Sequence, residues 1–162
     1  RDRFESTFFT ELAVNKLYGL MTQDATYSRD IPIVLSTNSD CELVDGLGTD
    51  ANNTTHERGA MNYNVSPGWS KLSNVWDAMY SIIENANLIV EGINKSSLLT
   101  SGDSDQRAME RFKGEALTIR AMVYFDLIRL FGDIPYKSES SNPDLSNVYL
   151  GKSDRDLSLI HI

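Results

Sequence analysis

Apolar residues recur at helical spacing along much of the chain, and their clearest run predicts one long helix that ends at Phe131. Two apolar stripes lie side by side in residues 113–135 and just before them. The first stripe holds Phe112, Ala116, Ile119, Val123, Leu127 and Leu130, and the second holds Leu117, Ala121, Tyr124, Ile128 and Phe131. Because both stripes follow the 3.6-residue period, we expect this helix to pack against neighbours on more than one side.

The residues at the two ends of this run set its boundaries. Asp103, with Gln106 three residues later, has the pattern of a capping box. Gly132 follows the last apolar residue and can adopt a left-handed cap, and Pro135 prevents the helix from continuing. The helix is therefore predicted over residues 103–131, a length of about 40 Å.

A narrow polar strip remains on this helix. Arg111 and Glu115 are four residues apart and Asp126 and Arg129 are three apart, so each pair can interact across one turn. Gly114 lies in the helix interior, where glycine costs about 1 kcal/mol relative to alanine. We therefore expect another backbone to pass close to Gly114.

A second apolar seam predicts another long helix over residues 67–94. Its members step by three and four positions: Trp69, Leu72, Trp76, Met79, Ile83, Ala86, Val90 and Ile93. Ser66 and Pro67 are residue types that favour the cap and the first helical position. A short polar link, residues 96–104, joins the two long helices, so we expect them to lie antiparallel.

A shorter helix is predicted over residues 7–21. Its apolar positions are Phe9, Leu12 or Ala13, Leu17 and Leu20. Thr7 or Thr10 can cap it, and Glu11 lies where the helix dipole favours an acid.

Between about residues 23 and 66 the helical period disappears. The run Ile31-Pro32-Ile33-Val34-Leu35 is broken by proline, so it predicts at most an edge strand or a buried extended segment. The rest is rich in turn residues such as Asp45-Gly46 and Asn52-Asn53. A loop of this length in a compact domain is either functional or disordered.

Charge and chemistry exclude several classes of function. The net charge of −8 and pI of about 4.7 argue against nucleic-acid binding, which needs the opposite sign. The single cysteine, Cys41, excludes an internal disulfide and is expected to be a small, half-buried residue. His56 and His161 have no other metal-ligating residue at a useful spacing. Residues 45–50 lack the alternating Asp/Asn ligands of an EF-hand loop, so no metal is expected.

Catalytic and membrane-spanning patterns are also missing from the sequence. It has no nucleophile motif and no glycine-rich phosphate loop, so we expect neither an enzyme nor a cofactor. No apolar run approaches the roughly 18 residues of a membrane span. Because no signal peptide is present either, we expect that the chain starts after any targeting segment, or never had one.

Four sets of residues resemble the SusD/RagB-like family of outer-membrane nutrient-binding lipoproteins of Bacteroidetes. In the long helix they are Gly114-Glu115-Ala116, Arg120-Ala121, Tyr124-Phe125-Asp126-Leu127 and Arg129-Leu130-Phe131-Gly132-Asp133-Ile134-Pro135. In the preceding helix they are Trp76, Tyr80, Ile83, Ala86 and Asn87, and residues 11–20 resemble the opening helix of the family. Residues 151–156 resemble the approach to a later helix.

The resemblance implies an all-α fold of tetratricopeptide-like antiparallel helical hairpins, with a long irregular loop inserted at about 23–66. It implies that residues 1–162 are the N-terminal part, a fragment, of a longer SusD-like domain. The implied function is cell-surface binding of glycans or similar nutrients for import. The implied partners are an oligosaccharide and a SusC-like TonB-dependent transporter, with an upstream lipid anchor in the outer membrane. The alternative is a helical-repeat scaffold that binds peptides or proteins.

Sugar binding needs flat aromatic faces together with amides and acids for the hydroxyl groups. The loop and the residue after it supply such side chains, and we expect carbohydrate contacts from Asn52, His56, Tyr63, Asn64 and Trp69. Trp69 is predicted to offer an accessible indole face because it lies in the first helical turn after a flexible loop. Trp76 is predicted to belong to the core.

Overall fold

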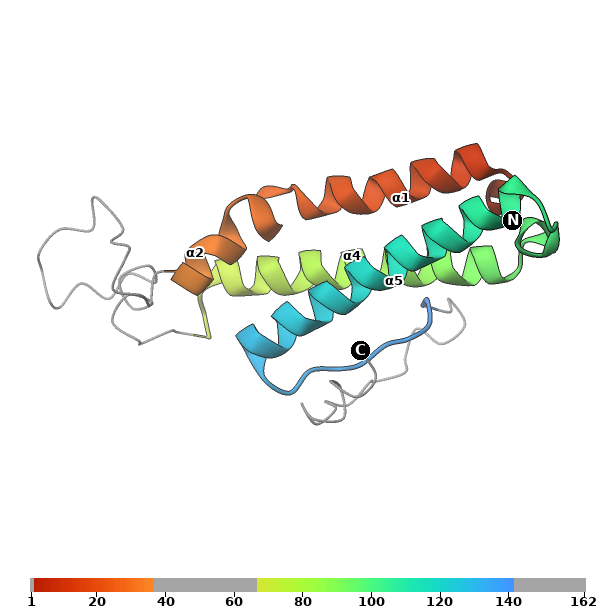
Figure 1. The fold of residues 1–162 in the computed structure, drawn as a ribbon. Coiled ribbons are helices and arrows are strands. Elements are labelled where there is room, and N and C mark those ends of the chain that lie inside the picture. Colours follow the sequence, from red (N-terminus) through yellow and green to blue (C-terminus); the bar gives the residue numbers. More distant parts are fainter. Residues whose placement is uncertain (1, 37–66, 142–162) are drawn as a thin grey trace, which may run out of the picture. The chain divides into compact units, whose positions relative to one another are not determined.

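The computed structural model describes residues 2–36 and 67–141, and every regular element in these ranges is a helix (Figure 1). The chain divides into two compact units. The first unit combines Arg1–Leu20 with Met79–Ile162, and the second is Met21–Ala78. The prediction of an all-α protein is confirmed for the described residues.

In the first unit, three long helical segments surround one apolar core. They are α1 (Thr7–Met21), the part of α4 (Ser70–Asn94) that follows Ala78, and α5 (Ser104–Phe131). Two short 3-10 helices, η1 (Asp2–Phe4) and η3 (Ser97–Thr100), also belong to this unit. Figure 1 shows α4 and α5 antiparallel, as the short link predicts.

Sequence periodicity located most of these boundaries. Both predicted bounds of α1 and the predicted last residues of α4 and α5 are confirmed, and Asp103 caps α5 directly before its first residue. However, α4 begins at Ser70 rather than at residue 67. Pro67 and Gly68 form a turn, and the Trp69 carbonyl accepts from the Leu72 N–H at 2.9 Å. Because glycine follows the proline directly, the chain turns there before the helix starts.

The core of the first unit follows the predicted stripe of α5 closely. Its buried apolar side chains are Val14, Leu17, Met79, Ile82, Ile83, Ala86, Ile89, Ile93, Met109, Phe112, Ala116, Ile119, Val123, Tyr124, Leu127, Ile128 and Ile134. On α1 the buried stripe is narrower than predicted and is formed by Thr10, Val14 and Leu17. Phe9 and Leu12, two of the apolar positions that indicate this helix, are about half exposed.

The ends of α5 are fixed as the sequence predicts. The Asp103 carboxylate accepts from the Asp105 N–H at 2.8 Å and the Gln106 N–H at 3.4 Å. The Gln106 side chain accepts in return from the Gly102 N–H at 2.9 Å, which is a capping box shifted by one residue. Gly132 has φ 73° and ψ −121°, and its N–H donates to the Ile128 carbonyl at 2.9 Å. A positive φ at this point favours glycine.

Two predictions about α5 have different outcomes. Arg111 pairs with Glu115 at 3.6 Å and Arg129 with Asp126 at 3.1 Å, as the spacing predicts. The prediction that a backbone passes close to Gly114 is wrong, because an added β-carbon there would meet nothing within 4 Å. The glycine that packs closely is Gly92 on α4, where a β-carbon would collide with the ring of Phe4.

The second unit corrects the prediction for residues 31–35. This run forms no extended segment, because Asp30–Ser36 is the helix α2, preceded by the short π-helix η2 (Asp24–Ser28). Pro32 lies in the first turn of α2, where its missing N–H removes no helical bond. Proline therefore favours the start of a helix here instead of excluding one.

A buried carboxylate anchors α2 within the second unit. Asp30 is 2% exposed and accepts from Arg29 Nε at 2.8 Å and from Lys71 Nζ at 3.4 Å. Burial alone would raise the pKa of Asp30, but the bonds from Arg29 and Lys71 outweigh it and lower the pKa below its usual value. The ion pair with Lys71 joins α2 to the start of α4.

None of the helices in residues 2–36 and 67–141 combines the length and the apolar character needed to cross a bilayer.

Candidate functional site

The structure tests only one of the five side chains predicted to contact sugar. Asn52, His56, Tyr63 and Asn64 lie outside the described residues. Trp69 is described and is only 2% exposed, so the prediction of an accessible indole face is wrong. A buried indole offers no surface on which a sugar ring can stack.

The second tryptophan also differs from its prediction. Trp76 is partly exposed, whereas Val75 beside it is fully buried. The buried side of α4 in the second unit therefore includes Val75 instead of the seam position occupied by Trp76.

Four of the family-like residues of α4 and α5 bond to the segment of residues 135–141: Tyr80, Asn87, Arg120 and Tyr124. We call this segment the strap. Figure 1 shows it leaving the end of α5 and turning back along the helices of the first unit. The Tyr80 hydroxyl donates to the Pro135 carbonyl at 2.7 Å. The Tyr124 hydroxyl donates to the Lys137 carbonyl and accepts from the Lys137 N–H, both at 2.8 Å.

Asn87 and Arg120 hold the middle of the strap. Asn87 is fully buried, and its amide nitrogen donates to the carbonyls of Lys137 at 3.1 Å and Glu139 at 3.0 Å. Its amide oxygen accepts from Arg120 Nη1 at 2.7 Å. Arg120 also donates to the Ser138 carbonyl at 3.1 Å. These bonds satisfy strap carbonyls that would otherwise lack a helical or strand partner.

Two glutamates of α4 hold the far part of the strap. Glu84 accepts from Lys137 Nζ at 2.6 Å and from the Ser141 N–H at 2.7 Å. Glu91 accepts from the Ser140 N–H and, at 2.9 Å, from the Ser140 hydroxyl. Partial burial would raise the pKa of Glu84, but the bonds from Lys137 and Ser141 lower it overall.

Burial also raises the pKa values of the two tyrosines that hold the strap. It raises the pKa of Tyr124 to about 12 and the pKa of Tyr80 well above its usual value. Both phenols therefore stay protonated at physiological pH and can donate to the strap carbonyls. Tyr80, Asn87, Arg120 and Tyr124, which belong to the family-like set, therefore position the strap.

A groove with mostly apolar walls lies between α1 and α4 of the first unit. It encloses about 580 Å³ and is lined by Arg3, Phe4, Phe9, Leu12, Ala13, Lys16, Asn85, Leu88 and Ile89. Phe9, Leu12 and Leu88 are 51%, 49% and 46% exposed. Sequence periodicity places Phe9 and Leu12 or Ala13 on the apolar side of the helix and does not identify this groove.

Two specific contacts join the elements that line the groove. At one end, Lys16 Nζ donates to Asn85 Oδ1 at 2.8 Å and so joins the two helices. At the other end, the Phe4 ring lies against Gly92. The absence of a side chain on Gly92 gives the ring its place, so one glycine shapes this end of the groove.

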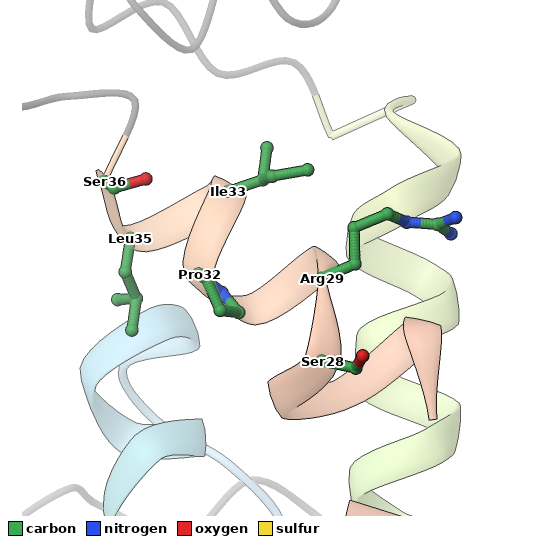
Figure 2. Close-up of a pocket in the computed structure, with 6 residues that line it drawn as sticks. All are labelled: Ser28, Arg29, Pro32, Ile33, Leu35 and Ser36. Carbon is green, nitrogen blue, oxygen red and sulfur yellow. The ribbon is translucent and has the colours of Figure 1, made fainter. Parts of the chain in front are cut away.

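A second hollow lies in the second unit beside α2. It encloses about 470 Å³, and Figure 2 shows the side chains that line it: Ser28, Arg29, Pro32, Ile33, Leu35 and Ser36. The Arg29 guanidinium is already bound by Asp24 and Asp30, each at 2.8 Å. Its charge is therefore compensated within the unit, and the hollow offers little for a ligand to recognise.

The part of the chain that the structure describes contains no candidate metal-binding cluster. No group of three or more histidine, cysteine, aspartate or glutamate side chains is placed there to hold an ion.

In the described residues the fold is helical, and the long antiparallel helices of the first unit hold the strap through hydrogen bonds. Residues 5–156 match the model of a SusD-like family described as starch-binding and associating with the outer membrane. The chain belongs to this SusD-like family. Its members are binding proteins without enzymatic activity, which confirms the expectation that the chain is not an enzyme.

Two curated relatives come from Formosa agariphila. SusD-like protein P2 is 26% identical over 133 residues, which cover 82% of this chain and 24% of the relative. SusD-like protein P25 is 27% identical over 148 residues, which cover 91% of this chain and 26% of the relative. The chain therefore spans about a quarter of the length of these relatives.

Solved structures show the same fold. A SusD homolog from Bacteroides thetaiotaomicron VPI-5482 superimposes with a TM-score of 0.79 over 95% of this chain and 28% of its own, at 22% identity. A SusD superfamily protein from the same organism gives a TM-score of 0.74 over 94% of this chain and 34% of its own, at 20% identity.

Proposed function

We propose that this protein captures glycans or similar nutrients at the cell surface and passes them to a TonB-dependent outer-membrane transporter. The observation that carries the proposal is the match of residues 5–156 to a family described by starch binding and outer-membrane association. In this proposal the protein is a surface lipoprotein held by a lipid anchor upstream of this chain. It binds its ligand reversibly and releases it unchanged, and its partner is a SusC-like transporter.

The architecture that we propose for the whole protein follows from the same membership. We assign the antiparallel pair α4 and α5 to the tetratricopeptide-like hairpins of SusD, and residues 1–162 to the N-terminal part of a larger helical domain. The close superposition on SusD structures supports the first assignment. The share of the relatives that the chain spans, about a quarter, supports the second.

For the sugar contacts we propose Asn52, His56, Tyr63 and Asn64. Their amide and imidazole groups can bond to sugar hydroxyls, and the ring of Tyr63 offers a flat apolar face. Trp69 is withdrawn from this set because its indole is buried.

Calorimetric titration of the protein with maltooligosaccharides and other neutral glycans tests the proposal. We expect reversible binding of at least one glycan, which chromatography recovers intact. Tyr63→Ala should weaken binding by about 1–3 kcal/mol, as the loss of an aromatic anchor does. Tyr18→Ala is the matched control, because this tyrosine is exposed on α1. Failure of every glycan to bind, or equal weakening by both variants, would contradict the proposal.

A further inference from the structure

The groove between α1 and α4 combines exposed apolar side chains with one sign of charge. Phe9 and Leu12 of α1 face the groove together with Leu88 of α4, and all three are about half exposed. Exposed apolar residues that gather in a groove with a polar rim mark interaction sites. Six of the nine lining residues are apolar, and Asn85 is the one uncharged polar residue among them. Such walls suit the apolar side chains of a protein better than the many hydroxyls of a sugar.

The dimensions of the groove fit the side of a helix. Along α4 it extends from Asn85 to Gly92, which corresponds to about 10 Å or two helical turns. A helix laid in such a groove inserts apolar residues at positions i, i+3 or i+4, and i+7. The volume of about 580 Å³ has room for a few such side chains.

The charge of the groove is opposite to that of the chain as a whole. The chain carries a net charge of −8, yet the ionisable side chains that line the groove are Arg3 and Lys16, both cationic. The nearby acids of α4, Glu84 and Glu91, are bound to the strap and do not line the groove. Arg3 forms no ion pair with any residue in the described ranges.

We propose that this groove docks an amphipathic helix of a partner protein, with the apolar stripe of that helix in the groove and acidic residues beside Arg3 and Lys16. The inference is independent of glycan capture, because it uses none of the residues proposed for sugar contact. Charge complementarity selects the partner: a cationic rim attracts an acidic helix and repels a basic one.

Two synthetic peptides of about 18 residues, long enough to form a helix, test the proposal. Both carry leucine at the same i, i+3, i+4 and i+7 positions, and the flanking residues are glutamate in one and lysine in the other. Fluorescence anisotropy with the 162-residue chain should show binding of the acidic peptide only. This binding should weaken as salt concentration rises, because the rim charges are exposed.

Variants of the chain locate the binding surface. Leu88→Glu should lower the affinity for the acidic peptide at least about tenfold, because the substitution removes an apolar contact and adds a repulsive charge. Met122→Glu is the matched control, because Met122 is a similarly exposed apolar residue on α5 outside the groove. Circular dichroism should show unchanged helix content in both variants.

Reversing the rim charges distinguishes charge-specific recognition from nonspecific hydrophobic binding. The double variant Arg3→Glu, Lys16→Glu should no longer bind the acidic peptide and should bind the basic one. Three outcomes would overturn the proposal: neither peptide binds, both bind equally, or the unmodified chain forms a dimer that Leu88→Glu dissociates in analytical ultracentrifugation. The last result would make a second copy of the chain the occupant. None of these outcomes affects the proposal of glycan capture.

Discussion

At the scale of single residues, Asn87 is a fully buried polar side chain that joins three parts of the first unit. Its three hydrogen bonds join α4, Arg120 of α5 and the strap. A buried amide with this many partners contributes through the groups it would leave unsatisfied as much as through its own bonds.

Asn87→Ala should therefore lower the free energy of unfolding by about 1–3 kcal/mol, because the Glu139 carbonyl and Arg120 each lose a partner. Asn74→Ala, an exposed asparagine on the same helix, should change it by less than about 0.5 kcal/mol. Urea unfolding followed by circular dichroism measures both. Similar losses in the two variants would show that the amide network contributes nothing specific.

The two helical glycines make a matched pair with opposite expectations. Gly114→Ala should raise stability by up to about 1 kcal/mol, because alanine favours the helix and the site has open space. Gly92→Ala should lower stability by about 1–3 kcal/mol, because the new methyl group displaces Phe4.

Thermal unfolding of the two glycine variants distinguishes these effects. A gain in stability from Gly92→Ala would mean that Phe4 moves aside at no cost. From the sequence one can infer that a glycine inside a helix is destabilising unless a close contact requires it. The sequence does not show which of the two glycines makes such a contact. That depends on a contact with Phe4, 88 positions away in the chain, which no local pattern records.

At the scale of elements, apolar periodicity was sufficient to predict the long helices. It was insufficient to predict the structure of the segments between and after them. The ends of α1, α4 and α5 follow from apolar spacing, a capping box and Gly132. The helix α2 was missed because it is too short to show a period, and because Pro32 was interpreted as a break instead of a first-turn residue. The strap has no pattern at all, since distant side chains hold its backbone.

The strap predicts a specific sensitivity to acid. The pKa of Glu84 is lowered in the folded protein, so its contribution to stability is fully present above the ordinary value of 4.5 and is lost as the pH falls below it. Glu84→Gln should thus lower stability at pH 7 and remove part of the decline seen below about pH 4.5.

The measurement for Glu84 is a series of urea unfolding curves from neutral to acidic pH. Asp77→Asn, an exposed acid on the same helix, is the control and should leave the pH profile unchanged. A Glu84→Gln variant whose stability declines as steeply in acid as that of the unmodified chain would show that the strap is not held by this carboxylate.

At the scale of the whole molecule, the sequence predicted the family and the helical class but placed the candidate site only in part. The family-like residues indicated the family. In the structure, three of them, Asn87, Arg120 and Tyr124, bind the strap and not a ligand pocket. The groove stayed hidden because an apolar residue on a helix gives the same signal whether it faces the core or an open groove. Only the packing of α1 against α4 decides between the two.

One helix belongs to both compact units, and this continuity predicts how the molecule unfolds. α4 runs without a break from Ser70 to Asn94, across the division between Ala78 and Met79. Because breaking a helix at its centre forfeits hydrogen bonds on both sides, we expect the two units to unfold together in one cooperative transition.

The two tryptophans make this expectation measurable. Trp69 and Trp76 both lie in the second unit, so their fluorescence reports on it, while far-UV circular dichroism is dominated by the long helices. The two denaturant midpoints should coincide. Trp69→Ala should shift both to lower denaturant by the equivalent of about 3–5 kcal/mol, because its indole is buried. Trp76→Ala should cost less, because that side chain is partly exposed. Two separate transitions, or a Trp69→Ala effect confined to fluorescence, would mean that α4 does not couple the two units.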